Sequence, residues 1–245
     1  MSASVGLLWR YPIKGIGCEP LTSVTLTADR PFPGDRAWAV LRDGQTDTGE
    51  WQRCATFLRG ASGPSLMAIM ATTTQQGIDL RHPDKATLSF DPETEASKLL
   101  DWLGGIWPDD KSAPAGLVKS PPQGMSDVDY PSVSILSLAS LAALGQAAGR
   151  TLDPRRFRGN LWLDGLAPWE EFEWIGRKIA VGSAVLEIVE RNERCRATEA
   201  NPDTGHRDTD VLGILEERWG HTDFGIYARV IQGGEVSLGD SAVLI

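Results

Sequence analysis

Cysteine is scarce in this chain of 245 residues, and its spacing excludes the common cysteine-based sites. The three cysteines, Cys18, Cys54 and Cys195, lie far apart and form no Cys-x-x-Cys pair. This spacing predicts neither a zinc site nor an iron–sulfur cluster, and an odd number disfavours a disulfide framework. A chain without disulfides fits a reducing compartment.

The chain also lacks long hydrophobic runs. No stretch approaches the length that spans a membrane, and residues 1–11 have neither the charged head nor the apolar core of a signal peptide. We therefore expect a cytoplasmic protein with no membrane partner. The net charge of −9, from 24 basic and 33 acidic residues, disfavours nucleic acid as a partner.

Several catalytic motifs are absent as well. The sequence contains no Gly-rich phosphate loop, no His-Glu-x-x-His and no Gly-x-Ser-x-Gly. The three histidines, His82, His206 and His221, are too far apart to show metal-ligand spacing. Nothing positively supports a Ser-His-Asp triad.

Short apolar segments separated by turn residues dominate what is present. Such segments are typical of strands in small barrels or sandwiches, so we expect a mainly β fold with a few helices, built from β-barrels. The expected strands are residues 5–11, 23–27, 36–41, 66–71, 77–80, 86–90, 161–163, 178–181, 184–191, 225–232, 235–238 and 242–245. We expect 178–181 with 184–191, and 225–232 with 235–238, to form hairpins.

Helical spacing of apolar residues predicts three helices, over 94–102, 134–149 and 210–219. Residues 108–123 are rich in Pro, Lys, Ser and Asp and show no periodicity, which is typical of a boundary or long loop. We therefore expect an N-terminal β-barrel domain over 1–110, a linker or long loop over 111–126, and a second domain over 127–245. The first strands of the N-terminal domain are free to pair with the second.

Cys195 is the cysteine with an electropositive local sequence, because it lies between Arg194 and Arg196. Flanking cations favour a thiolate, the form of cysteine that binds metals. On these residues alone, a small buried and inert cysteine remains an equally good interpretation.

Cations beside Gly, Asn or Pro recur at expected strand ends, at Lys14, Arg36, Arg158 and Arg194. Converging cations would form an anion cradle together with backbone amides. Taken one at a time, each has the sequence context of an ordinary solvated surface charge.

The stretch 194–205, with Arg194-Cys195, Thr198 and a closing Asn-Pro-Asp-Thr-Gly turn, resembles the signature of MOSC domains. This family is named for the molybdenum cofactor sulfurase C-terminal domain. Weaker matches follow in the expected order at Tyr11-Pro12-Ile13-Lys14, Asp35-Arg36-Ala37-Trp38, 134–142, Phe157-Arg158-Gly159-Asn160 and Gly239-Asp240. The resemblance spans nearly the whole chain, including the N-terminal β-barrel domain that often precedes MOSC. Within the family, the chain resembles the mitochondrial amidoxime-reducing component and its bacterial counterparts.

The resemblance implies a molybdenum–pterin cofactor, without pyridoxal phosphate, in an oxidoreductase that reduces N-hydroxylated small molecules. Cys195 would be the metal ligand and catalytic residue. The cofactor-binding residues that it implies are Lys14, Arg36, Arg158, Asn160, Arg194 and Thr198. Because the chain has no cysteine cluster for an iron–sulfur domain, electrons would come from a separate electron-transfer protein.

Three departures from the family pattern keep other functions open. Gly15 stands where such reductases commonly have Ser, Asp129-Tyr130-Pro131 where Asp-Thr-Ser is common, and Asn201 where Asp is usual. A non-catalytic carrier or storage protein for the cofactor therefore remains an alternative. A sulfur carrier that uses a Cys195 persulfide is a third, although no second cysteine is near in sequence to resolve it.

Overall fold

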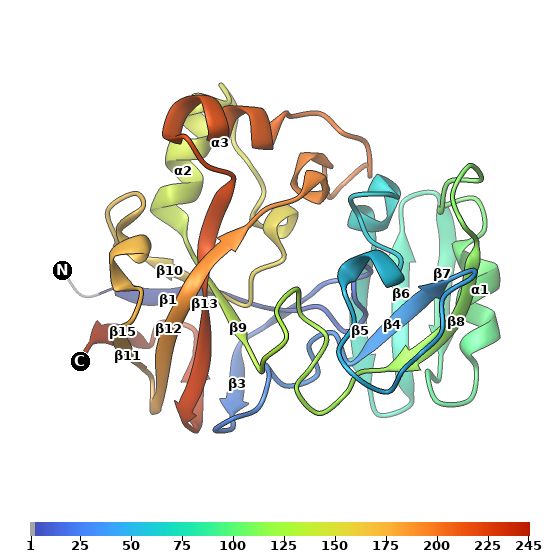
Figure 1. Cartoon of the computed structure of the whole chain (residues 1–245), viewed down its shortest axis with the longest axis horizontal. Coiled ribbons are helices and arrows are strands. Elements are labelled where there is room, and N and C mark those ends of the chain that lie inside the picture. Colours follow the sequence, from blue (N-terminus) through green and yellow to red (C-terminus); the bar gives the residue numbers. More distant parts are fainter. Residues whose placement is uncertain (1–2) are drawn as a thin grey trace.

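Seven strands close into a barrel in the computed structural model, which describes residues 3–245 (Figure 1). Around the barrel the order is β10, β9, β13, β12, β11, β15 and β1, and β1 pairs back onto β10. Their bounds are β1 Ala3–Arg10, β9 Val133–Ser137, β10 Leu161–Asp164, β11 Lys178–Val181, β12 Ala184–Glu193, β13 Asp223–Gln232 and β15 Ser241–Leu244. The expected mainly β fold with a few helices is confirmed.

Alternation of side chains explains why the barrel has a filled interior. Successive residues of a strand point to opposite faces, and along β12 the alternate residues Ala184, Leu186 and Ile188 are buried. They pack against Ile226 and Val230 of β13 in one core cluster. The predicted hairpin of β11 and β12 is present, with Val181 opposite Ala184.

Two helices cover one end of the barrel (Figure 1). Helix α2, Leu138–Ala147, begins where β9 ends, and the Ser137 hydroxyl accepts from the Ser140 N–H as its cap. The prediction of one helix over 134–149 was wrong in its first turn. Residues 133–137 are a strand buried at every position, and a short apolar run of this kind does not distinguish a buried strand from a helix.

Helix α3, Val211–Trp219, lies close to the predicted 210–219. Asp210 caps it by accepting from the Gly213 N–H, and Gly220 ends it in a left-handed conformation. Leu215 of α3 packs with Leu144 of α2 in a second core cluster under both helices.

A second unit, with its own core, is built mostly from residues 38–119 (Figure 1, right). Its elements are β4 Trp38–Arg42, β5 Met70–Thr74, β6 Gly77–His82, β7 Lys85–Phe90, α1 Ala96–Leu103 and β8 Pro114–Lys119. Strands β5, β6 and β7 form an antiparallel sheet, and β8 pairs with β4. Part of the segment 111–126, predicted as a linker or long loop, is therefore a strand of this unit. An edge strand with a proline and a glycine shows little periodicity.

The first strand belongs to the N-terminal half of the sequence but pairs with strands of the C-terminal half. Strand β1 pairs with β10 and β15, so the N-terminal residues complete the barrel of the C-terminal half. Strand β2, Glu19–Leu21, extends the sheet beside β1. The chain enters the second unit only afterwards.

Two further predictions were wrong. Residues 64–68 form a 3₁₀ helix, so the strand expected over 66–71 starts only at Met70. Strand β14, Gly234–Ser237, does not form a hairpin with β13 but pairs with β3, Ser23–Leu26. A Gly-Gly pair allows the chain either to turn back along β13 or to continue to β3, so it does not determine the partner of β14. In residues 3–245, no helix is long and apolar enough to cross a membrane.

Candidate cofactor site

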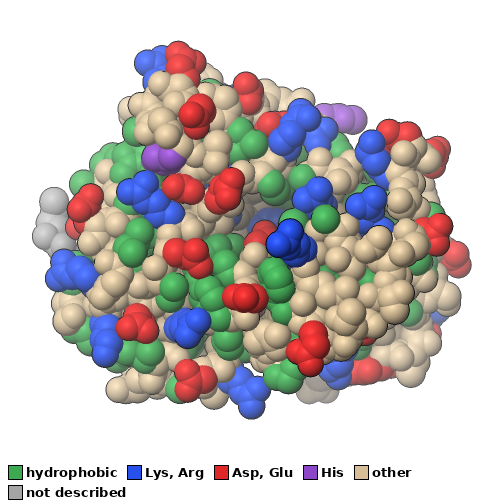
Figure 2. All heavy atoms as spheres, in the orientation of Figure 1, with side chains coloured by type: hydrophobic (Ala, Val, Ile, Leu, Met, Phe, Trp, Pro, Cys, Tyr) green, Lys and Arg blue, Asp and Glu red, His purple; other side chains and the backbone are tan. Residues whose placement is uncertain are grey.

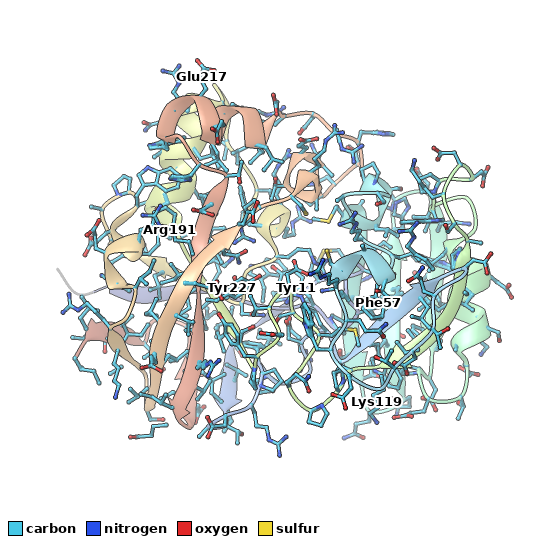
Figure 3. All side chains as sticks on the ribbon, viewed as in Figure 1. Tyr11, Phe57, Lys119, Arg191, Glu217 and Tyr227 are labelled. Carbon is cyan, nitrogen blue, oxygen red and sulfur yellow. The ribbon has the colours of Figure 1, made fainter. Side chains whose placement is uncertain are left out.

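A small pocket of about 80 Å³ lies where the barrel meets the second unit. Figure 2 shows the surface hollowed there, with Lys and Arg side chains at its rim, and in Figure 3 Tyr11 and Tyr227 lie between the two units. The lining residues are Lys14, Gly15, Arg36, Cys54, Arg59, Gly60, Asp127, Arg156, Phe157, Arg158, Glu193, Arg194, Cys195, Ala197, Thr198 and Tyr227. Six of them are cations and two are carboxylates, so the pocket is electropositive although the protein is acidic.

Cys195 lies at the exposed side of this pocket, directly after β12 and before the 3₁₀ turn Arg196–Glu199. Loss of hydration raises the pKa of its thiol, and Asp127 acts in the same direction. A hydrogen bond from the Ala197 backbone and the charge of Arg194 oppose this without overcoming it. The charge of Arg194 thus favours the thiolate, whereas loss of hydration favours the thiol.

The two arginines that flank Cys195 in the sequence make different contacts. Arg194 donates from Nε to the Phe224 carbonyl (2.7 Å) and from Nη1 to the Phe157 carbonyl (2.8 Å), which ties the cysteine loop to neighbouring segments. Burial lowers the pKa of Arg194 to about 10. Arg196 is not among the residues that line the pocket, and its side chain is 64% exposed and pairs with Glu199.

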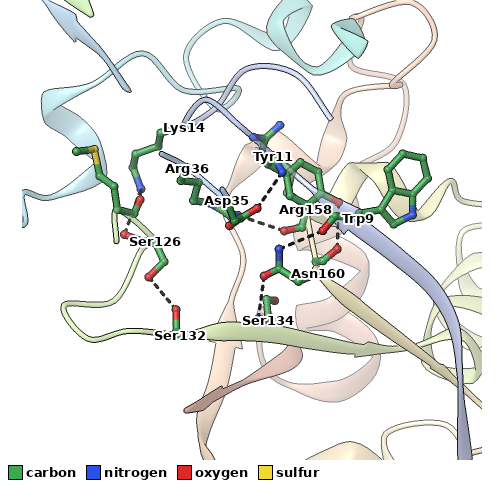
Figure 4. A network of polar contacts seen from close by, with 12 residues as sticks. Trp9, Tyr11, Lys14, Asp35, Arg36, Ser126, Ser132, Ser134, Arg158 and Asn160 are labelled. Atoms are coloured by element: carbon green, nitrogen blue, oxygen red, sulfur yellow. Dashed lines mark hydrogen bonds and ion pairs between the residues drawn. The ribbon is translucent and has the colours of Figure 1, made fainter. Parts of the chain in front are cut away.

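Arg36 and Arg158 both contact Tyr11. The Arg158 guanidinium lies 4.4 Å from the centre of the Tyr11 ring and that of Arg36 lies 5.4 Å from it. The Tyr11 hydroxyl donates to the Gly159 carbonyl, and its backbone N–H donates to Asp35 (Figure 4). One buried aromatic ring thus holds two pocket arginines together.

Both arginines also have left-handed backbones, with φ of 49° at Arg36 and 50° at Arg158. Residues with a Cβ rarely adopt this region, and when they do they are often found at functional sites. Arg36 pairs with Asp35 and donates to the Arg158 carbonyl (3.2 Å). Arg158 donates to the carbonyls of Gly17 and Ile13, and its burial lowers its pKa to about 10.

Lys14 is buried and surrounded by acceptors of one loop. Its ammonium donates to the carbonyls of Met125 (2.8 Å) and Ser126 (3.3 Å) and to Asp127 Oδ1 (2.6 Å) (Figure 4 shows the carbonyl contacts). Packing around the carboxylate raises the pKa of Asp127, whose side chain is 58% exposed, but Lys14 and Arg36 outweigh this effect and hold the pKa at about 2. The carboxylate is therefore ionised at neutral pH beside both cations.

Thr198 and Asn160 have different surroundings. Thr198 lines the pocket, and its hydroxyl donates to the Cys195 carbonyl (3.0 Å). Asn160 is buried and does not line the pocket. Its side chain accepts from the Ser134 N–H (3.1 Å) and donates to the Trp9 carbonyl (3.2 Å), so it links β9 with β1 (Figure 4). Of the residues expected at the site, the structure gathers all but Asn160.

Sequence patterns missed several residues that line the pocket, among them Cys54, Arg59, Asp127 and Tyr227. Cys54 and Arg59 lie in an irregular segment whose one short element is the 3₁₀ turn Cys54–Thr56, so nothing in its periodicity marks it. Tyr227 lies within β13, and an aromatic residue in a strand does not by itself indicate a functional site. Asp127 lies just past the expected linker.

The three departures from the family pattern have different surroundings. Gly15 has a φ of 73°, and a Cβ there would lie 2.7 Å from the Leu58 carbonyl oxygen. Asn201 shapes its turn by accepting from the Asp203 N–H, outside the pocket lining. Residues 129–131 also lie outside the lining, and the Tyr130 hydroxyl donates to Glu190 (2.6 Å).

Comparison with known families fits this architecture. Residues 126–243 match the MOSC domain, and residues 2–114 match the MOSC N-terminal β-barrel domain. The chain is a MOSC-domain protein. This membership supports a function associated with the molybdenum cofactor.

Individual relatives of this MOSC-domain protein are distant. Mitochondrial amidoxime reducing component 2 from Bos taurus is 24% identical over 287 residues, covering 97% of this chain and 82% of the relative. The YuaD protein structure from Bacillus subtilis is 13% identical, with a TM-score of 0.48 over 99% of this chain and 94% of that one. The YiiM structure from Geobacillus stearothermophilus is 20% identical, with a TM-score of 0.38 over 46% of this chain and 53% of that one.

The pocket residues of this MOSC-domain protein fit such a cofactor in charge and ligand type. A thiol at the pocket's exposed side offers a soft ligand, which suits a metal held by other sulfur ligands. Arg59 and Arg156 each carry a buried Nε without a hydrogen-bond partner among the described residues. Unsatisfied donors in an electropositive pocket favour an anionic, acceptor-rich group.

Proposed function

We propose that this protein is a molybdenum-cofactor-dependent reductase of N-hydroxylated compounds, with Cys195 as the protein ligand of the metal. The observation that carries the proposal is the convergence in one pocket of Cys195 with Lys14, Arg36 and Arg158. These residues are far apart in sequence and come from both halves of the chain. A cysteine that merely fills space in a core would be neither exposed nor surrounded by cations.

The cofactor, when bound, supplies the two-electron chemistry at the metal. The overall reaction balances as R–NH–OH plus two protons and two electrons giving R–NH₂ and water. The protein contributes ligation, orientation and electrostatics. Lys14, Arg36, Arg158, Arg194 and Thr198 are proposed to face the cofactor, while Asn160 supports the strands beneath them.

The chain's own residues prepare the thiol for metal binding. The Ala197 backbone donates a hydrogen bond that favours the charged form, and Arg194 adds a favourable charge. A metal would supply the remaining stabilisation, because coordination replaces the thiol proton. Binding of the metal is therefore proposed to release one proton from Cys195 at neutral pH.

Electrons are proposed to come from a separate protein. The three cysteines cannot hold an iron–sulfur cluster, since Cys18 is buried away from the pocket and only Cys54 and Cys195 line it. We also propose that the substrate is a small molecule and that the protein is cytoplasmic.

The proposal is tested by molybdenum analysis and turnover together. Protein from a cofactor-producing host should contain about one molybdenum per chain by mass spectrometry and should reduce an aromatic amidoxime when a chemical reductant is supplied. Cys195→Ala should abolish the reduction. Cys18→Ala is a matched control, because it removes a thiol that lies outside the pocket.

Two outcomes would contradict the proposal. Full turnover by Cys195→Ala would refute the ligand assignment. Stoichiometric pterin with no turnover of any N–O compound would instead indicate the carrier or storage alternative, and a labile sulfane sulfur on Cys195 without metal would indicate sulfur transfer.

A further inference from the structure

Arg59 differs from every other cation of the pocket in its partners. Its Nη1 donates to Cys54 Sγ at 3.4 Å, and its buried Nε has no partner among the described residues. Sulfur is a weak acceptor, and no carboxylate of residues 3–245 pairs with this guanidinium. Arg59 is thus a half-buried cation in a pocket with its charge unmatched.

The other five pocket cations already have oxygen acceptors. Their partners are Asp127 for Lys14, Asp35 for Arg36, Asp208 for Arg156, the Gly17 and Ile13 carbonyls for Arg158, and the Phe224 and Phe157 carbonyls for Arg194. These contacts fix the pocket wall. They leave Arg59 as the one pocket cation without an oxygen acceptor among the described residues.

The Arg59 segment packs against the segment that carries Cys195. A Cβ on Gly60 would lie 3.2 Å from the Ala197 Cβ, so these backbones are in close contact. Cys54, which Arg59 contacts, lines the same pocket as Cys195. Arg59 and Cys195 are therefore carried by adjacent segments of the pocket wall.

The backbone of Arg59 is also held in place. The Leu58 N–H donates to the Val40 carbonyl of β4 (2.9 Å), and Gly15 packs directly against the Arg59 Cα. A cation held on a fixed backbone loses little freedom on binding, which favours specific recognition over a loose surface contact.

We propose that Arg59 binds a carboxylate of the substrate, so that this protein prefers N-hydroxylated compounds that carry a carboxylate. The proposal rests on the proposed function above. A guanidinium presents two parallel N–H donors that match the two oxygens of a carboxylate. The alternative source of an anion at Arg59 is the phosphate of the cofactor itself.

The test uses an aromatic amidoxime and the same molecule with a para carboxylate. With cofactor-loaded protein and no reductant, titration calorimetry measures binding without turnover. Arg59→Gln should raise the dissociation constant of the carboxylate compound roughly tenfold or more, as for the loss of charge-assisted hydrogen bonds. The ratio of kcat/KM for the carboxylate over the neutral compound should fall by a similar factor.

Two variants control for other effects. Arg53→Gln removes the same charge from the same segment, but Arg53 is exposed and does not line the pocket. It should bind the carboxylate compound as the wild type does. Arg59→Lys keeps the charge and should recover part of the binding, and thermal unfolding of all three variants checks that they fold.

Three results would overturn the proposal. One is unchanged carboxylate binding by Arg59→Gln, and another is an equal loss in Arg53→Gln. The third is a lower molybdenum content in Arg59→Gln, which would assign the residue to the cofactor's phosphate. If the wild type reduces no amidoxime but Arg59→Gln still binds the carboxylate compound more weakly, the assignment of Arg59 stands and only the reductase function is refuted.

Discussion

Asn160 has a structural role that its short sequence motif does not indicate. Its side chain joins β9 to β1, and its own backbone N–H donates to the Ser134 carbonyl while its carbonyl accepts from the Trp9 N–H. This single residue therefore fixes the register between three strands near the pocket. Its importance lies in barrel stability, and any effect on the cofactor is indirect.

We expect Asn160→Ala to lower the free energy of unfolding by about 2–3 kcal/mol, because it leaves the buried Ser134 N–H without an acceptor. Urea unfolding at pH 7 measures this. Gln75→Ala, at an exposed residue with no side-chain hydrogen bond, is the control and should change stability by less than about 0.5 kcal/mol. A loss below that level for Asn160→Ala would contradict the assignment.

Gly15 is the second residue where the structure gives a definite prediction. Gly15→Ser introduces the residue common in related reductases but should lower the free energy of unfolding by at least about 1–2 kcal/mol. The cause is a left-handed φ together with overlap of the new Cβ with the Leu58 carbonyl. Thermal unfolding of the two proteins decides this, and a serine variant as stable as the wild type would show that the 57–60 segment moves aside easily.

At the residue scale, sequence predicted the site where a cation or thiol stood in a recognisable pattern. Lys14, Arg36, Arg158 and Cys195 were expected at the site, and the structure gathers them in one pocket. Arg59 was not predictable, because its place depends on the packing of residues 54–60 against the cysteine loop. The desolvation of the Cys195 thiol was not predictable either, because it depends on tertiary packing that sequence neighbours do not report.

Among the elements, the 3₁₀ turn Glu170–Trp174 and helix α2 are joined by a buried carboxyl group. The Ser140 hydroxyl donates to Glu171 Oε2 (2.9 Å), and Glu171 Oε1 has no hydrogen-bond partner within residues 3–245. Burial raises the pKa of Glu171 to about 7, against the opposing effects of its own backbone N–H and of Ser140. The folded protein thus favours the protonated carboxyl.

This shift predicts a specific pH dependence. Because the folded pKa is above the unfolded value of 4.5, the contribution of Glu171 is fully present below about pH 4.5 and is lost as the pH rises through about 7. Relative to Glu171→Gln, the wild type should lose on the order of 3 kcal/mol between pH 4.5 and pH 8. Urea unfolding of both proteins at pH 4.5, 6 and 8 measures the difference, and a constant difference across this range would contradict the prediction.

Elements with strong end signals were predicted best. Helix α3 has an Asp cap and a closing Gly, and its predicted and observed bounds nearly coincide. Strand β9 was predicted as part of a helix, because a fully buried strand lacks the alternation that identifies half-buried ones. The pairing partners of strands were less predictable: β14, near the C-terminus, pairs with β3, near the N-terminus.

At the scale of the whole molecule, the two halves of the sequence are not independent. Strand β1 closes the barrel between β10 and β15, so residues 127–245 alone would expose two unpaired strand edges and the barrel core. We expect a 127–245 fragment to give no cooperative thermal transition by circular dichroism, whereas the full chain gives one. A fragment that unfolds cooperatively at the same temperature as the full chain would show that β1 is dispensable.

The central claim, that Cys195 binds molybdenum, is tested most directly by X-ray absorption at the molybdenum edge. In a pterin cofactor the dithiolene supplies two sulfur ligands, so the wild type should show three sulfurs at the metal. Cys195→Ser, loaded in the same host, should show two, while Cys54→Ser should keep three. Three sulfurs in Cys195→Ser, or two in the wild type, would contradict the account.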